Sequence, residues 1–435
     1  MTSTWSRAAE LAAQTPASRN RTVDFFRALS ILAVIAGHWT AAAPYLDAEG
    51  KLTPSHILAA ADWTHWLTWV IQVMPVFFMV GGFSNGLTWR AAWRDGVPYG
   101  EWLGGRLKRL VWPVLPLLVV WVAMGVLAHE FGVSPTMVRV GSQMALIPTW
   151  FLAVYLGVVV LVPLTHALWE RFGWLSFGGF ALAAVAVDAA FFHGHHALGW
   201  VNYLFVWSAV HQLGYAWSDG KLADPRKTVP MFVAGLGLLI VLTTIGPYPR
   251  AMVGVPGDAI SNTTPPKITL IALALAQGGL LLSLQGPLSR WLARAVPWTA
   301  TVLINGMIMT IYLWHLTSMV LWIGLAYALG GVGLAHLPGT RAWWRARPLW
   351  MAMLVVMLFP LVMIFSRFER PKTSATTPPA WRLVSGASLL IVGLALLALD
   401  GIGGTGWFGL RPAVLALPFA GALLIGASAG ARSSA

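Results

Sequence analysis

The sequence predicts an all-α protein, a polytopic bundle of helices that cross a membrane many times. Hydrophobic residues fill 57% of its 435 positions and charged residues only 10%, whereas soluble proteins carry about 25% charged residues. So few charges cannot cover the surface of a soluble protein of this size. The 25 tryptophans also suit a bilayer, because their rings are apolar and their N–H groups favour the interface.

Apolar runs of about 20 residues, the length that spans a bilayer as a helix, mark the expected spans. The ninth run is long enough to be tilted or broken, and the last two flank the glycine-rich stretch Gly401–Gly406. The twelve runs lie near residues 28–46, 66–88, 110–128, 144–168, 174–192, 199–217, 228–246, 266–285, 299–330, 348–366, 384–400 and 411–428.

The charge distribution predicts which way the chain crosses the membrane. The net charge is +13, which in a soluble protein would suggest a nucleic acid partner, but here the basic residues lie in short loops between apolar runs. If the N-terminus is cytoplasmic, 20 of the 28 Lys and Arg residues face the cytoplasm. Cytoplasmic loops are enriched in these residues. We therefore expect both termini inside and the protein in the plasma membrane.

The first span contains two residues that suit chemistry. Arg27 and His38 are eleven residues apart, about three helical turns, so they lie on nearly one face and roughly 16 Å apart along the axis. Arg27 lies at the expected cytoplasmic end, and His38 near the middle of the span. An ionisable side chain at that depth is a functional candidate by default, and histidine is a plausible general base near neutral pH. A histidine bonded to a neighbouring helix remains the alternative.

Two further groups lie in later spans. Arg106 and Arg109 share a helix face at the cytoplasmic start of the third span, where two guanidinium groups suit a phosphate. Composition alone favours anchoring or contact with lipid headgroups for this pair. Tyr312 and His315 lie one turn apart inside the ninth span, and they fit a polar cavity and ordinary helix packing equally well.

Several kinds of site are not expected. The chain has no cysteine, which removes disulfides, thiol nucleophiles and cysteine-bound zinc from consideration. His193, His195 and His196 cluster on the expected outer side, but no carboxylate accompanies them at ligand spacing. We therefore expect no metal ion and no nucleic acid partner, and the motifs of nucleotide-binding loops, serine hydrolases and zinc proteases are missing from the sequence.

Taken together, the motifs resemble those of membrane-bound acyltransferase family 3. The first-span motif of that family is a basic residue, ten residues and a histidine, here Arg27 and His38 preceded by Asp24. The departures are Gly81, where the family usually has serine, and the two last spans. The other matching segments are Phe77–Phe83, Arg106–Arg109, Trp150–Leu152, Tyr312–His315 and Phe368–Pro371.

The resemblance implies ten family-like spans plus two C-terminal ones. The corresponding segments are a tail at 1–24, an acyltransferase-like domain at 25–372, a linker at 373–383 and two added spans at 384–435. The sequence includes no fused extracellular esterase-like domain of the kind that some members carry.

The family transfers an acyl group, usually acetyl, from acyl-CoA to a hydroxyl of a glycan, a lipid or a secreted metabolite. By this resemblance His38 is the base, and Tyr312 or His315 orients the acceptor or stabilises the oxyanion. Arg27, Arg106 and Arg109 bind the phosphates of acyl-CoA. The alternative is a twelve-span secondary transporter or exporter, although transporters tend to show internal repeats, and the sequence shows no clear repeat.

Overall fold

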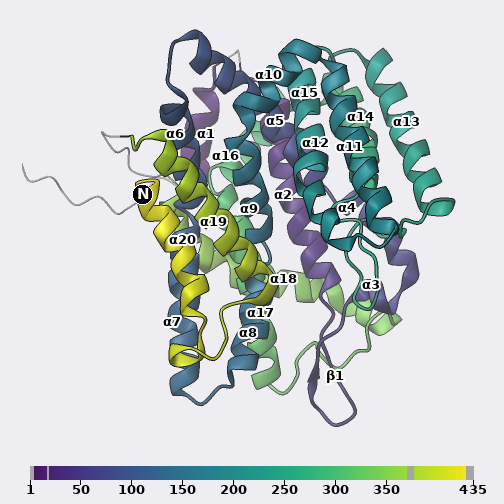
Figure 1. Cartoon of the computed structure of the whole chain (residues 1–435). Coiled ribbons are helices and arrows are strands. Elements are labelled where there is room, and N and C mark those ends of the chain that lie inside the picture. Colours follow the sequence, from purple (N-terminus) through teal and green to yellow (C-terminus); the bar gives the residue numbers. More distant parts are fainter. Residues whose placement is uncertain (1–3, 17–18, 370–376, 428–435) are drawn as a thin grey trace, which may run out of the picture. The chain divides into compact units, whose positions relative to one another are not determined.

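The computed structural model describes residues 4–16, 19–369 and 377–427, and helices dominate it (Figure 1). This confirms the predicted all-α class. The chain divides into two compact units, each assembled from segments that are distant in the sequence. Unit 1 comprises Met1–Thr88, Val162–Ile308 and His336–Trp343, and unit 2 comprises Trp89–Leu161, Met309–Ala335 and Trp344–Ala435.

Unit 1 contains the first span and the middle of the chain. A two-stranded antiparallel hairpin follows the first span. In chain order the elements of unit 1 are α1 (Thr4–Ala13), α2 (Arg21–Ala41), β1 (Tyr45–Leu46), β2 (Leu52–Thr53), α3 (Ile57–Ala60), η1 (Asp62–Leu67), α4 (Thr68–Ile71), most of α5 (Met74–Arg94), α10 (Val162–Phe172), α11 (Trp174–Phe192), η2 (His196–Val201), α12 (Asn202–Ser218), α13 (Pro225–Thr244), α14 (Ile268–Ser283), α15 (Gln285–Leu292) and α16 (Ala295–Asn305).

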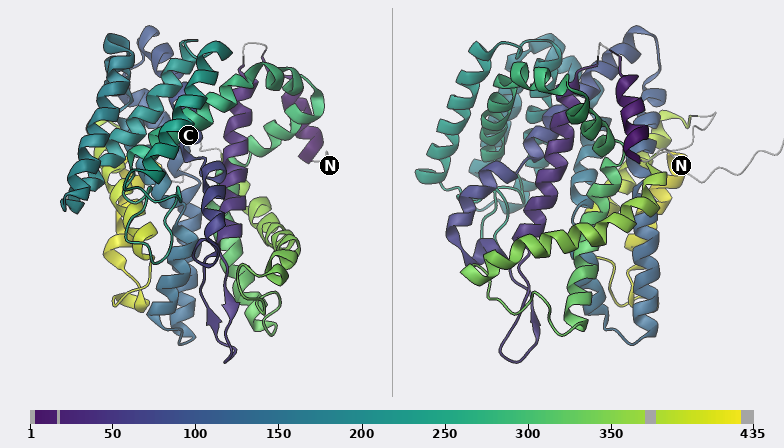
Figure 2. Two further views of the ribbon diagram at one scale, coloured as in Figure 1. Left: turned by 90° about the vertical axis from the view of Figure 1, so that its right-hand side faces the viewer. Right: turned by 180° about the vertical axis from the view of Figure 1, so that it is seen from behind.

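Small residues allow the helices of unit 1 to pack closely. Helices α13 and α14 run side by side (Figure 1), and a Cβ atom on Gly279 would lie only 2.4 Å from the backbone nitrogen of Phe232. Close approach of this kind is how membrane helices associate without a hydrophobic driving force. The short helix α1 lies against α16 (Figure 2), where the Trp298 indole donates a hydrogen bond of 3.0 Å to Thr15 Oγ1.

Unit 2 contains the third and fourth expected spans and the C-terminal part of the chain. Its elements are the end of α5, α6 (Tyr99–Val111), α7 (Val114–Glu130), α8 (Pro135–Leu146), α9 (Thr149–Val160), α17 (Ile308–Ala328), most of α18 (Arg341–Phe365), η3 (Ser366–Phe368), α19 (Ala380–Asp400), η4 (Trp407–Gly409) and α20 (Pro412–Leu424).

The C-terminal pair of helices is an integral part of unit 2. Helices α19 and α20 form a hairpin, and α19 also packs along α9. The Thr149 hydroxyl donates a hydrogen bond of 2.9 Å to the Leu394 carbonyl, and the Gln143 amide donates one of 2.6 Å to the Leu399 carbonyl. These bonds connect the hairpin to α8 and α9.

Fewer helices are long enough to cross a bilayer than the twelve expected. Among the described residues eight pass by length and hydropathy, or ten if two bent pairs each count as one span. The bends are 50° between α8 and α9 and 54° between α14 and α15. Helices α12 and α20 have only 17 and 13 residues. The ninth run is broken as expected, because α16 ends at Asn305 and α17 begins at Ile308.

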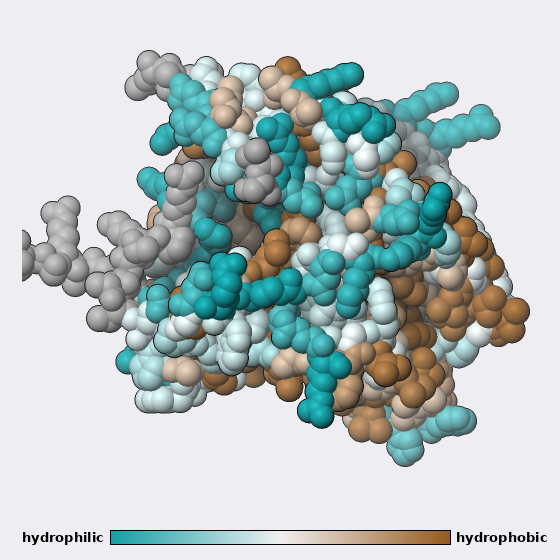
Figure 3. Space-filling view, turned by 90° about the horizontal axis from the view of Figure 1, so that it is seen from above, coloured by the Kyte–Doolittle hydropathy of each residue, from teal (hydrophilic) through white to brown (hydrophobic). Residues whose placement is uncertain are grey.

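The outer surface of the long helices suits lipid. Large apolar side chains are exposed along α13, such as Val233 and Val241, and along α18, such as Val356 and Phe359. Figure 3 views the end that is uppermost in Figure 1: hydrophilic side chains gather on it, and hydrophobic ones gather along one margin. Exposed apolar surface on this scale marks contact with a membrane or a partner, so the helices form a multi-pass membrane protein.

Candidate functional site

Arg27 and His38 lie on α2, as predicted. The Asn20 side chain caps this helix by accepting hydrogen bonds from the backbone N–H groups of Thr22 and Val23, which fixes where the helix begins. Arg27 lies in the second turn and His38 in the last. The helix ends at Ala41 rather than near residue 46 as expected, so His38 lies near the end opposite Arg27 and not halfway along the helix. Their axial separation remains roughly 16 Å.

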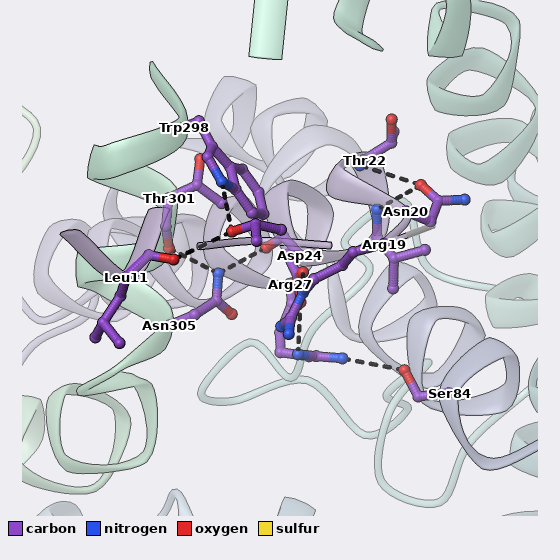
Figure 4. Close-up of polar contacts among 12 residues, drawn as sticks. Leu11, Arg19, Asn20, Thr22, Asp24, Arg27, Ser84, Trp298, Thr301 and Asn305 are labelled. Carbon is purple, nitrogen blue, oxygen red and sulfur yellow. Dashed lines mark hydrogen bonds and ion pairs between the residues drawn. The ribbon is translucent and has the colours of Figure 1, made fainter. Parts of the chain in front are cut away.

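The Arg27 guanidinium is held on two sides within unit 1 (Figure 4). Its Nη1 is 3.1 Å from Oδ1 of Asp24, one turn earlier on the same helix. Its Nη2 donates a hydrogen bond of 3.0 Å to the Ser84 hydroxyl on α5. The Asp24 side chain is only 7% exposed, and it also binds Arg19. Because Asp24 and Ser84 hold the guanidinium from two helices, Arg27 has a fixed orientation.

Neighbouring helices fix the start of α2 in place. The Asn305 amide at the end of α16 donates a hydrogen bond of 2.9 Å to the Asp24 carbonyl (Figure 4). Arg21 donates one of 2.8 Å to the Leu292 carbonyl at the end of α15. Because these bonds join three helices, the segment that carries Arg27 is rigid.

His38 is half-buried, and the sequence did not predict its neighbour His56. The hairpin β1–β2 folds the chain back after α2, so that Ala42 and His56 form a β-bridge. The imidazoles of His38 and His56 are close enough to interact electrostatically. The Nδ1 of His56 accepts a hydrogen bond of 3.3 Å from the backbone N–H of Leu58, and burial lowers the pKa of His56. Desolvation therefore disfavours the charged form of the His56 imidazole.

Arg106 and Arg109 lie in unit 2 on α6, a helix of its own that ends just before Pro113 and precedes α7. Arg106 is half-buried, and its guanidinium lies 5.7 Å from the centre of the Trp102 ring. Arg109 is exposed. Both charges therefore lie on one amphipathic helix, where the Arg106 guanidinium packs against an aromatic ring and the Arg109 guanidinium is exposed. Two guanidinium groups on one helix suit a surface that attracts anions.

Tyr312 and His315 are both buried in α17 of unit 2. The Tyr312 hydroxyl donates a hydrogen bond of 2.9 Å to the carbonyl of Pro148, at the bend between α8 and α9. The Nδ1 of His315 lies 2.5 Å from the Tyr312 carbonyl. A carbonyl can only accept, so Nδ1 carries the proton. In a neutral imidazole Nε2 is then an acceptor.

The described parts of the chain contain no group of three or more His, Asp or Glu side chains placed to hold a metal ion. The candidate residues instead provide guanidinium groups and imidazoles. Guanidinium groups bind phosphates, and imidazoles move protons near neutral pH. Arg27 and His38, both in unit 1, provide one group of each kind.

Comparison with known proteins identifies the family. The acyltransferase domain of acyltransferase family 3 matches residues 20–367, which include α2 with Arg27 and His38, α6 and α17. The match ends before α19 and α20. The comparison with curated proteins and the comparison with solved structures gave no match. The match over most of its length shows that the chain belongs to acyltransferase family 3 and is a membrane acyltransferase.

Proposed function

We propose that this protein is an acyl-CoA-dependent O-acyltransferase that moves an acyl group, usually acetyl, onto a hydroxyl of a cell-envelope glycan, a glycolipid or a secreted metabolite. The observation that carries the proposal is the placement of Arg27 and His38 at opposite ends of α2. Their separation of roughly 16 Å is comparable to an extended pantetheine arm. If Arg27 holds the nucleotide part of acyl-CoA, the pantetheine arm is long enough for the thioester to reach His38.

In the proposed reaction His38 acts as the general base. Its imidazole takes the proton from the acceptor hydroxyl while the oxygen attacks the thioester carbonyl carbon. The tetrahedral intermediate then breaks its carbon–sulfur bond, and the leaving thiolate takes the proton from the His38 imidazolium. The products are an ester and free CoA, so no other reactant is required. A covalent variant passes through a transient acyl-His38.

We propose the following roles for the remaining candidate residues. Arg27, Arg106 and Arg109 bind the phosphates of the donor, since guanidinium groups bind phosphate oxygens in pairs. His315 orients the acceptor hydroxyl. The Tyr312 hydroxyl is occupied by the Pro148 carbonyl, so Tyr312 acts by fixing His315 and the bend between α8 and α9.

The donor is cytoplasmic, so its binding residues belong on the cytoplasmic side. We place the N-terminus in the cytoplasm and the protein in the plasma membrane, because that orientation puts Arg27, Arg106 and Arg109 on the side where acyl-CoA is made and follows the positive-inside rule.

A transporter is the less favoured reading, because the family match covers residues 20–367. A strain that lacks the gene separates the two. Mass spectrometry of its envelope glycans, lipids and secreted metabolites should show one acyl substituent missing, with the unacylated compound still present on the same side of the membrane. Complementation with wild-type protein should restore the substituent. A compound that is fully acylated but retained inside the cell would instead support export.

A further inference from the structure

Two guanidinium groups share one buried carboxylate at the start of α2 (Figure 4). Arg19 binds Asp24 through two atoms, Nε at 2.6 Å from Oδ2 and Nη2 at 3.2 Å from Oδ1. Arg27 binds the same carboxylate through Nη1 at 3.1 Å. The carboxylate therefore holds two cationic side chains next to each other, although Arg19 precedes the helix and Arg27 lies in its second turn.

This arrangement has spare capacity for an anion. The Asp24 side chain is 7% exposed, whereas those of Arg19 and Arg27 are 54% and 28% exposed. Each guanidinium has five N–H donors, and the contacts with Asp24 and Ser84 occupy two on each. Asp24, Arg19 and Arg27 together carry one net positive charge. The N–H donors that remain unused belong to the two arginines, whose side chains are more exposed than that of Asp24.

The surroundings also favour an anion here. The start of a 21-residue helix carries a partial positive charge. The hydrogen bond to Asp24 raises the pKa of Arg19, so Arg19 is charged at every working pH. Arg21 is directed elsewhere, because its guanidinium binds the Leu292 carbonyl and lies 4.9 Å from the centre of the Trp298 ring.

We propose, on the basis of the proposed function, that Arg19 binds the ribose 3′-phosphate of the CoA donor while Arg27 binds its diphosphate, and that Asp24 is the positioning residue for both. The order follows from the helix. If the thioester lies at His38, the extended pantetheine arm places the diphosphate near Arg27. The 3′-phosphate is farther from the thioester than the diphosphate, so it lies beyond Arg27, near the more exposed Arg19. A phosphate monoester is close to a dianion at neutral pH and matches the guanidinium fork.

Equilibrium binding to the full chain in detergent tests the assignment without requiring turnover. The probes are acetyl-CoA and acetyl-3′-dephospho-CoA, which lacks only the phosphate in question. Arg19→Gln should raise the Kd for acetyl-CoA about tenfold, the loss of one charge-assisted hydrogen bond, and should leave the Kd for the dephospho donor within about twofold. The matched control Arg7→Gln removes an exposed arginine from α1 and should change neither Kd.

A second variant tests the positioning role of Asp24. Asp24→Asn makes the site more positive, so electrostatics alone predicts tighter binding of an anion. If Asp24 positions the two arginines, the variant should instead bind acetyl-CoA more weakly, while its affinity for acetyl-pantetheine, which lacks every phosphate, should stay unchanged. Equal weakening toward both ligands would contradict the positioning role. Should this variant fail to fold, Arg19→Gln alone decides the proposal.

The outcomes separate this proposal from the proposed function. If wild-type protein binds the two CoA donors equally well, or if Arg19→Gln weakens both to the same extent, the 3′-phosphate assignment is wrong even when acetyl transfer is measured. If binding follows the prediction but the wild type transfers no acetyl group to any envelope acceptor, the phosphate assignment stands and the acyltransferase reaction fails.

Discussion

The sequence predicted that Arg27 and His38 of the candidate site share one helix, but it did not predict which side chains contact them. Arg27 and His38 share one helix because their spacing is local, and such spacing can be read from a sequence. Their partners Ser84 and His56 are brought close by tertiary structure, α5 for the first and the β1–β2 hairpin for the second. A single sequence contains no signal for such pairs.

Substitutions of Tyr312 and His315 test whether Tyr312 has a structural role and His315 a role in orienting the acceptor. Tyr312→Phe removes the hydrogen bond to Pro148, so it should destabilise the protein by about 1 kcal/mol and leave kcat little changed. His315→Gln should lower kcat about 100-fold, the scale on which a misoriented reactant slows a reaction, at unchanged stability. Thermal unfolding and acetyl-transfer kinetics in detergent measure both. A large fall in kcat for Tyr312→Phe without loss of stability would show that the Tyr312 hydroxyl takes a direct part in catalysis.

Arg106 and Arg109 test whether α6 binds the donor or only anchors the chain. The double substitution to Gln removes two cationic groups, so KM for acetyl-CoA should rise at least tenfold, or about 1.4 kcal/mol, with kcat changed less. Substituting Arg90 and Arg94, which lie at the end of α5 on the same expected side, gives a control with equal loss of charge. If both double variants raise KM equally, these arginines act through general electrostatics or topology.

At the scale of helices, close packing between α5 and α12 supports the site. A Cβ atom on Gly82 would lie 1.9 Å from the carbonyl oxygen of His211, so only glycine allows this approach. Ser84, the partner of Arg27, lies two residues further along α5. A change in the position of α5 therefore reaches the guanidinium of Arg27.

Substitution of Gly82 by Ala should therefore destabilise the protein by about 1–3 kcal/mol, as overpacking does, and should also weaken donor binding through Ser84. Gly178→Ala on α11 provides the control, because a Cβ atom at Gly178 meets no other atom within 4 Å. Unfolding followed by tryptophan fluorescence gives the comparison. Equal stability of the two variants would show that α5 and α12 are not packed as described.

Element prediction succeeded where a long apolar run forms one straight helix and failed where the chain bends. The first run was predicted correctly as a helix, but its end was placed five residues too late, because the apolar residues after Ala41 belong to a turn and a hairpin. The bends of α8 to α9 and α14 to α15 are likewise invisible in hydropathy, which reports burial in lipid but not direction.

At the scale of the whole molecule, the sequence predicted the class and the family, and the structure adds the grouping of segments. The two C-terminal helices, which the sequence presents as an addition, pack on α9 and bind α8 and α9 through hydrogen bonds. They therefore belong to the same unit as α6 and α17. This grouping depends on contacts between distant segments, so no local pattern could predict it.

The orientation of the molecule can be tested directly because the chain has no native cysteine. Glu10→Cys on α1 and Asp258→Cys in the loop before α14 each introduce one exposed thiol and each remove one negative charge. With a membrane-impermeant maleimide, intact cells should label only Asp258→Cys, and permeabilised cells should label both. Labelling of Glu10→Cys in intact cells would contradict the proposed orientation, because it would place the arginines proposed to bind the donor outside the cytoplasm.

The proposed role of His38 in acyl transfer from acyl-CoA is tested most directly by measuring the transfer of radiolabelled acetyl from acetyl-CoA to envelope material by purified protein. The wild type and the exposed-histidine control His193→Ala should transfer label at the same rate. His38→Ala should be folded, bind acetyl-CoA normally and lose at least 100-fold in kcat. Transfer by His38→Ala at a rate close to that of the wild type would contradict the account.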